Sequence, residues 1–175
     1  MARETYLDIG APRANGLKNP KSDDGGDEFG LVANGSEGSW DVDVDESLSG
    51  EQRWYLQIDG PAMYLDCEIE HPRVVEAILR FLSAHTGNNG DASLPASCGD
   101  SELEVARKGE NRVALVWDTR ANDRCAVLIS GPTEFCARFI LERGDLQDLI
   151  GALRQVHDEL LDAGLAPPTL AQPSK

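Results

Sequence analysis

The chain matches itself when it is shifted by 71 positions. The shift places Ile58-Asp59-Gly60-Pro61 on Ile129-Ser130-Gly131-Pro132. It also places Val75, Ile78, Leu79 and Leu82 on Leu146, Leu149, Ile150 and Leu153. An internal repeat constrains the fold before any local pattern does. The sequence therefore predicts two copies of one structural unit within 175 residues.

Each copy contains four runs that read as strands, followed by one run with the spacing of an amphipathic helix. The strand runs are 29–33, 40–45, 54–58 and 63–70 in the first copy, and 103–106, 113–117, 125–129 and 135–141 in the second. We expect the second helix to open at Asp145, with Asp148 in its first turn. The predicted fold is α+β, an internal duplication of a ββββα unit with two antiparallel sheets, each with one helix, in a pseudo-twofold arrangement.

Composition divides the chain around these two units. Residues 1–28 are predicted to be a flexible N-terminal segment, because 10–28 are rich in Gly, Pro, Asn and Asp. The first repeat is expected at 29–85 and the second at 101–163. They are joined by a linker at 86–100 and followed by a disordered tail at 164–175. We expect one compact body overall.

This order of elements resembles that of the single-strand nucleic-acid-binding folds of the Pur and whirly type. That resemblance implies an alternative function in which Trp54, Tyr64 and the arginines of the second copy bind single strands. Such folds bind through basic, aromatic sheet faces, whereas this chain has a net charge of −15. A charge of that sign opposes the phosphate contribution to affinity, so nucleic acid is disfavoured as a partner.

The negative charge is concentrated in the first copy. Residues 1–100 contain 19 acidic and 7 basic residues, and residues 101–175 contain 12 and 9. An acidic surface attracts cationic partners, although it also serves solubility. The imbalance between the copies favours a basic protein as partner.

Two strand runs of the first copy carry carboxylates at alternating positions. Asp41, Asp43 and Asp45 alternate with Trp40, Val42 and Val44, and Asp66, Glu68 and Glu70 alternate with Leu65, Cys67 and Ile69. If both strands lie in one sheet, the six carboxylates share a face. Three interpretations stay open: a solvated sheet face, a docking face for a cationic protein, or a divalent-metal site. The last is weakest, because side chains along a strand do not converge on one ion.

Neighbouring aromatic residues add to this surface. Trp54 and Tyr55 are consecutive on a strand, so they point to opposite faces. One of them must face away from the helix of its own copy. That residue is either buried between the copies or offered to a partner as an anchor.

The four cysteines form no metal-binding spacing. Cys125 and Cys136 would face each other if their strands pair appropriately, but we expect them to be small buried hydrophobic residues in a reducing compartment. No catalytic motif, cofactor or metal ligand set is predicted. An enzyme with a site between the repeats remains an alternative. No signal peptide or membrane span is predicted, and we expect a cytoplasmic protein.

The sequence thus predicts a non-catalytic, acidic protein-binding module. Its most concrete form is an immunity or antitoxin-type inhibitor that docks an acidic sheet face on a basic partner protein. The predicted partner-binding residues are Asp41, Asp43, Asp45, Asp66, Glu68, Glu70, Trp54 and Tyr55. A homodimer through the C-terminal helix, with Val156 and Leu160 as contacts, is a further alternative.

Overall fold

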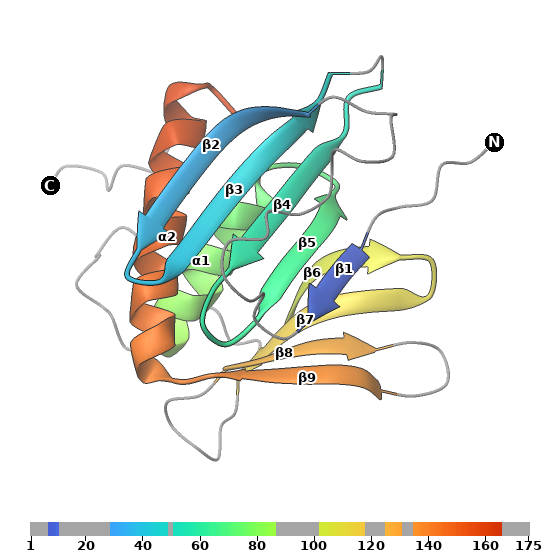
Figure 1. The fold of residues 1–175 in the computed structure, drawn as a ribbon, viewed down its shortest axis with the longest axis vertical. Helices are drawn as coiled ribbons and strands as arrows, with labels where there is room; N and C mark the ends of the chain where they lie inside the picture. The colour runs from blue at the N-terminus through green and yellow to red at the C-terminus, as the bar shows by residue number, and fades with distance from the viewer. Residues whose placement is uncertain are drawn as a thin grey trace, which may run out of the picture.

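The part of the chain that the structure describes contains two helices and two antiparallel sheets, so the predicted α+β class is confirmed (Figure 1). The computed structural model describes residues 7–10, 29–48, 51–86, 102–117, 125–130 and 135–165. Sheet A has the strand order β1-β5-β4-β3-β2. Its strands are β1 (Leu7–Gly10), β2 (Phe29–Glu37), β3 (Trp40–Ser47), β4 (Trp54–Asp59) and β5 (Tyr64–Ile69).

Sheet B has the strand order β6-β7-β8-β9. Its strands are β6 (Glu102–Lys108), β7 (Asn111–Trp117), β8 (Cys125–Ser130) and β9 (Phe135–Leu141). The helices are α1 (Val74–His85), between the two sheets in the sequence, and α2 (Arg143–Asp162), after sheet B. All eight predicted strand runs and both predicted helices are thus present, in the predicted order.

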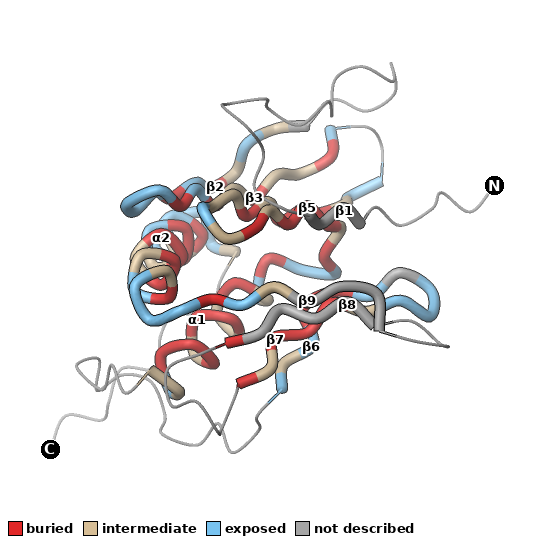
Figure 2. Tube along the Cα trace, turned by 60° about the horizontal axis from the view of Figure 1, so that its bottom comes forward, coloured by how far each residue is buried: buried red, intermediate tan, exposed pale blue. Residues whose placement is uncertain are grey.

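The strands of sheet A form because alternate side chains can be buried together on one face. The pairing places Val42 opposite Ile58, and Ile58 opposite Leu65, in one row across the sheet. The next row contains Val44, Leu56 and Cys67, all of them fully buried. This inner face packs on the helices and forms the main core, which appears as the red segments in Figure 2.

Strand β1 corrects part of the prediction for the N-terminus. Residues Leu7–Gly10 pair with β5 in antiparallel register, with Leu7 opposite Cys67 and Gly10 opposite Tyr64. The predicted flexible segment 1–28 therefore contains a strand of four residues. Four residues are too short to display a reliable alternating pattern, and a neighbouring strand is needed to define them. The rest of that segment, the linker at 87–100 and the tail from residue 166 lie outside the described residues.

Each helix contacts strands of the other half of the chain. Helix α2 packs on β2 and β3, whereas α1 packs on α2 and contacts β6. At the end of α1, His85 stacks on Trp117 of β7 with ring centroids 5.0 Å apart, and its edge contacts Phe81. The two sheets therefore share one core around the helix pair.

The first turn of α2 differs from the prediction by a few residues. The helix begins at Arg143, and Glu142 is its N-cap, in a reciprocal capping arrangement with Asp145 at the third helical position. The backbone N–H of Glu142 donates to Oδ2 of Asp145 over 3.4 Å. Asp145 thus supports the helix start from inside the helix, as a capping box requires.

Side chains of α2 close the exposed edge of sheet A. Strand β2 is the last strand of that sheet, so alternate backbone groups have no strand partner. The backbone N–H of Ser36 donates to Oε1 of Gln155 over 3.1 Å, and Nε2 of Gln155 donates back to the carbonyl oxygen of Ser36 over 2.8 Å. The backbone N–H of Asn34 donates to Oε2 of Glu159 over 2.9 Å. Two helix residues one turn apart therefore take the place of a sixth strand.

This closure depends on a glycine in β2. A Cβ atom at Gly35 would collide with the carbonyl oxygen of Ala152 and lie 2.9 Å from Cβ of Gln155. Only a residue without a side chain lets the helix approach closely enough for Gln155 to reach the strand. The β2–β3 turn contains a second glycine with a specific role, Gly38, which has a φ of 59°.

The proposed dimer contacts of α2 are wrong. Val156 and Leu160 are both 0% exposed within the single chain, because the apolar stripe of α2 packs against sheet A and α1. Residues that are already buried cannot form a second interface. The long apolar stripe that suggested a dimer is explained by the contact between the two halves.

The strand register shows where Cys125 and Cys136 lie in the β8–β9 hairpin. Cys125 lies opposite Leu141 at one end of the β8–β9 pair, whereas Ser130 and Phe135 are opposite each other at the other end. Cys136 follows Phe135 in β9, so its backbone lies at the opposite end of the hairpin from that of Cys125. Cys67 and Cys125 are buried and are not in a disulfide, as predicted for them.

Gly35→Ala is predicted to lower the free energy of unfolding by about 1–3 kcal/mol, because the new methyl group displaces α2 from β2. Gly144→Ala is the matched control, since a Cβ atom at Gly144 meets nothing within 4 Å. The control should be neutral or stabilising by up to about 1 kcal/mol. Urea denaturation of the full chain measures both. Equal stability of the two variants would contradict the close packing of α2 on β2.

Cys125 is predicted to be unreactive in the folded protein. Burial raises the pKa of its thiol to about 12, so at pH 8 only about one thiol in ten thousand is ionised. Iodoacetamide followed by peptide mass spectrometry should leave Cys125 unmodified under native conditions and modify it in urea. Rapid modification without denaturant would show that the β8–β9 end of the core opens readily.

Candidate functional site

The outer face of sheet A, on the side away from the helices, collects polar residues from three neighbouring strands. We call this surface the acidic face. Its residues on β3, β4 and β5 are Asp41, Asp43, Asp45, Tyr55, Gln57, Asp59, Tyr64, Asp66 and Glu68. The pairing of β4 with both β3 and β5 shows that five of the six predicted carboxylates, all except Glu70, share one face.

The strand register brings like charges directly opposite one another. Asp41 on β3 is the cross-strand partner of Asp59 on β4. The hydroxyl of Ser36 donates to Oδ1 of Asp41, and Nε2 of Gln57 donates to Oδ2 of Asp59 over 2.8 Å. Neutral donors thus hold both carboxylates in place. Opposed like charges destabilise a sheet by a few tenths of a kcal/mol up to about 1 kcal/mol, so this pair lowers the stability of sheet A.

One arginine borders the acidic face. Nη1 of Arg53 lies 3.9 Å from Oε2 of Glu68, and Nη2 lies 3.1 Å from Oε2 of Glu51. Hydrogen bonding to Glu51 is the main cause that raises the pKa of Arg53, and Tyr55 and Glu68 act in the same direction. The guanidinium is positioned by several groups at the end of β4 where the chain enters the strand.

Two predicted carboxylates do not belong to an open acidic surface. Asp66 is on the predicted face, but it is 0% exposed, so it cannot touch a partner as the protein stands. Glu70 follows the end of β5 and is exposed, but it lines a separate groove described below. Of the six predicted carboxylates, those on this face that a partner could reach are therefore Asp41, Asp43, Asp45 and Glu68, which are exposed or half-buried.

The predicted aromatic anchors are buried. Trp54 lies on the inner face, 5% exposed, with its ring centroid 6.3 Å from that of His71. Tyr55 lies on the outer face, as the alternation requires, but it is also only 5% exposed. Neither side chain is available as an exposed anchor. The burial of Trp54 also removes one of the two aromatic residues on which the single-strand nucleic-acid alternative depended.

Sequence reasoning missed the contribution of β4 to this face. Gln57 and Asp59 are half-buried and stand between the carboxylates of β3 and β5. They alternate with Leu56 and Ile58, which is the same pattern that revealed β3. The pattern was hidden because Trp54 and Tyr55 give the start of this strand an uninterrupted aromatic and apolar run.

The corresponding face of sheet B is not acidic. In sheet B, β7 is next to the edge strand β6, as β3 is next to the edge strand β2 in sheet A. At the positions 71 residues after the three aspartates, β7 has Arg112, Ala114 and Val116. Arg112 is paired with Glu102 on β6. The aspartates of β3 thus have no counterpart on β7, and the carboxylates on the same face of β6, Glu102 and Glu104, are paired with Arg112 and Arg107.

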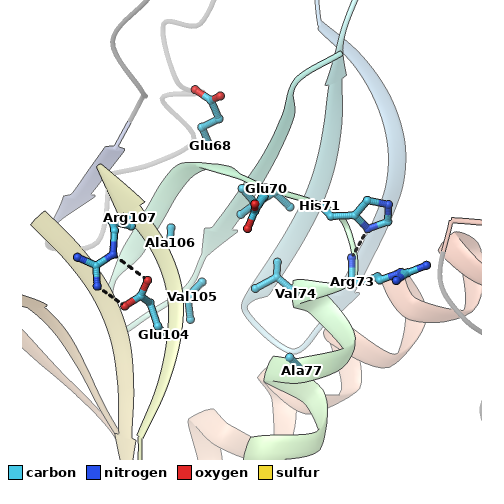
Figure 3. Close-up of a pocket in the computed structure, with 11 residues that line it drawn as sticks. Glu68, Glu70, His71, Arg73, Val74, Ala77, Glu104, Val105, Ala106 and Arg107 are labelled. Carbon is cyan, nitrogen blue, oxygen red and sulfur yellow. Dashed lines mark hydrogen bonds and ion pairs between the residues drawn. The ribbon is translucent and has the colours of Figure 1, made fainter. Parts of the chain in front are cut away.

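A groove of about 620 Å³ separates the end of β5 and the start of α1 from β6. We call it the intersheet groove, and Figure 3 shows the residues that surround it. Its lining residues are Glu68, Ile69, Glu70, His71, Arg73, Val74, Ala77, Glu104, Val105, Ala106 and Arg107. The groove lies between the two predicted repeats, where the enzyme alternative placed a site.

The polar groups of the groove are mostly paired with their neighbours. Arg107 donates two hydrogen bonds to the carboxylate of Glu104, from Nε over 3.0 Å and from Nη2 over 2.7 Å. These bonds lower the pKa of Glu104 and raise that of Arg107. Nδ1 of His71 accepts a hydrogen bond from the backbone N–H of Arg73 over 3.1 Å. The residues that line the groove include no nucleophile held by a base.

Within the described part of the chain, no three His, Cys, Asp or Glu side chains are grouped so as to hold a metal ion. None of the helices described here is long and apolar enough to cross a membrane. No known protein family matches the chain, and no significant similarity to a curated protein or to a solved structure is found.

Asp41→Asn is predicted to raise the free energy of unfolding at low ionic strength by about 0.5 kcal/mol, because it removes the charge opposite Asp59. The asparagine amide oxygen can still accept the hydrogen bond from Ser36, so the change isolates the charge. The gain should shrink in about 0.5 M salt, which screens exposed charges. Urea denaturation at both salt concentrations tests this, with Asp158→Asn on the exposed side of α2 as control. A loss of more than about 1 kcal/mol would show that Asp41 stabilises the sheet.

Proposed function

We propose that this protein is a non-catalytic binding protein that docks the acidic face of sheet A on a basic partner protein. The observation that carries the proposal is the placement of Asp41 directly opposite Asp59, beside Asp43 and Asp45 on the same face. A solvated surface needs polar residues but not opposed carboxylates. An arrangement that lowers stability is reasonable where it increases attraction to a cationic partner.

The contrast between the two sheets supports the same proposal. Solubility alone would favour unpaired carboxylates on both outer faces. Instead, β7 has Arg112, Ala114 and Val116 where β3 has aspartates, and Glu102 and Glu104 of β6 are paired with arginines. The acidic face therefore gives the molecule one strongly negative side. Such a side steers a basic partner into one orientation and raises the rate of association at low salt.

The most concrete form of this function is an immunity or antitoxin-type inhibitor in the cytoplasm. Proteins that cut nucleic acids present basic surfaces along the path of the phosphate backbone. A rigid sheet with rows of carboxylates can cover such a surface and exclude the substrate. The antiparallel strands hold the carboxylates at fixed spacing, so little side-chain ordering is needed when the complex forms.

We further propose that the chain is a duplicated ββββα unit with pseudo-twofold symmetry. Three observations support this. Strands β4 and β8 begin 71 residues apart, at Trp54 and Cys125. The turns of the two first hairpins contain Gly38 and Gly109, with φ of 59° and 57°. Each helix also contacts the edge strand of the other half's predicted repeat, α2 with β2 and α1 with β6.

The proposed function predicts that replacing Asp41, Asp43 and Asp45 together by asparagine weakens partner binding by about tenfold or more. The immobilised chain is incubated at low salt with lysate of its own source cells, and bound proteins are eluted with salt and identified by mass spectrometry. Wild-type protein should retain a basic protein that the triple variant does not. If that protein cuts nucleic acid, wild-type chain should inhibit the cutting and the triple variant should not.

The matched control replaces Glu110 by Gln and Asp158 and Asp162 by Asn, which removes three charges from exposed positions outside the acidic face. This control should bind the partner as the wild type does. Equal losses in both variants would show that net charge alone governs binding. Retention of the same protein by the triple variant in about 0.5 M salt would refute the proposal.

A further inference from the structure

The edge strands β2 of sheet A and β6 of sheet B differ in whether a helix bonds to their backbone. In sheet A the outer edge of β2 is closed, because Gln155 and Glu159 of α2 bond to the backbone of Asn34 and Ser36. In sheet B the edge strand β6 contacts both α1 and β5. Among the described residues, however, no side chain of α1 bonds to the backbone of β6. That edge borders the intersheet groove instead.

The lengths of the two helices explain this difference. Helix α2 has 20 residues and α1 has 12. The two residues that close β2 lie in the second half of α2. Their counterparts 71 residues earlier are Ala84, which has no polar side chain, and Asn88, which comes three positions after the last residue of α1 in the sequence. The groove-facing part of α1 contributes Val74 and Ala77, which have no hydrogen-bonding side chain. Backbone N–H and C=O groups at the edge of β6 therefore border the intersheet groove without a bond to a helix side chain.

We propose that the intersheet groove binds an extended, basic peptide segment of a partner protein, which adds to β6 as a fifth strand of sheet B. An unpaired sheet edge supplies backbone donors and acceptors in the spacing of a strand. A volume of about 620 Å³ lies within the usual range of ligand sites, roughly 300–1,000 Å³. The interaction uses backbone hydrogen bonds for affinity and the groove walls for selection.

The side chains that line the intersheet groove determine which peptide side chains fit it. Ile69, Val74, Ala77 and Val105 give the groove apolar walls for every second side chain of a strand. Glu70 is exposed and has no partner among the described residues. Figure 3 shows that it lies between strand β6 and the loop that follows β5. The guanidinium of Arg73 lies on the side of that loop away from β6 (Figure 3). Because Glu104 already neutralises Arg107, the unmatched charge beside β6 is negative and favours lysine or arginine.

This inference assigns a second surface and stands on residues other than the aspartates of the acidic face. The two surfaces are nevertheless adjacent, because Glu68 belongs to the acidic face and also lines the groove. A partner with a basic surface and a basic extended segment could occupy both at once. The experiment must therefore separate binding in the groove from binding on the face.

The probe is a capped peptide of alternating lysine and valine, about eight residues long, the length of an ordinary strand. Its affinity for the full chain is measured by isothermal titration calorimetry, and the amides of residues 102–108 are followed by NMR and hydrogen exchange. We expect binding, slower exchange of β6 amides and no binding of a glutamate–valine peptide of equal length. A lysine–valine peptide with alternate N-methyl groups cannot pair as a strand and should bind at least about tenfold more weakly.

Two variants place the binding in the groove. Ala77→Trp fills the groove from the helix side, and Glu70→Lys reverses the unmatched charge. Each should weaken the lysine–valine peptide by about tenfold or more, and Glu70→Lys should permit the glutamate–valine peptide to bind. Glu110→Lys, in the β6–β7 turn outside the groove, makes the same charge change and should have little effect. Thermal unfolding and the far-ultraviolet spectrum confirm that each variant is folded.

The outcomes separate this inference from the proposed function. Binding that survives Ala77→Trp but is lost in the triple asparagine variant would locate the peptide on the acidic face and overturn the groove site while supporting the face. No binding of the lysine–valine peptide, or equal binding of its N-methylated form, would overturn strand addition at β6. Loss in Ala77→Trp and Glu70→Lys with retention in the triple variant would establish the groove as a separate site.

Discussion

The contact between α2 and β2 determines how the rest of the structure is arranged. It joins residues more than 100 positions apart, with Gln155 bonded to both the N–H and the C=O of Ser36. It requires Gly35, because any side chain there would separate helix and strand. The same contact closes the edge of sheet A and buries the apolar stripe of α2. Once α2 lies there, the inner face of sheet A is covered and only its outer face remains for a partner.

Sheets A and B share an order of strands but differ in their exposed surfaces. Sheet A has a closed β2 edge and an acidic outer face, whereas sheet B has an unclosed β6 edge and a β7 strand without carboxylates on that face. The difference follows from a few residues: eight additional helical residues in α2, one glycine in β2 and three aspartates in β3. Two halves with the same order of strands and helix thus differ in their surfaces while they share one core.

The sequence predicted the order of elements and the direction of most strand side chains, because both follow from the local period of apolar residues. Asp41, Asp43 and Asp45 lie on the outer face because Val42 and Val44 must be buried. The sequence did not predict contacts that depend on packing over long distances. The burial of Asp66 and Tyr55, the crossing of α2 to the other sheet and the strand at Leu7–Gly10 each need a neighbour that lies far away in the sequence. Val156 and Leu160 were wrongly predicted as dimer contacts for the same reason, since a long apolar stripe does not reveal whether it is covered by its own chain.

The position of Glu68 links the two proposed surfaces. Its carboxylate lies opposite Tyr55 on the acidic face, and Arg53 approaches it to within 3.9 Å, while the same residue forms one end of the intersheet groove. A basic segment in the groove would therefore place positive charge beside the acidic face. Charge there would neutralise part of the negative field and repel a second, separate cation on the same side. Two separate cationic ligands would therefore weaken each other's binding, and the two surfaces would act together only for one partner that carries both a basic surface and a basic extended segment.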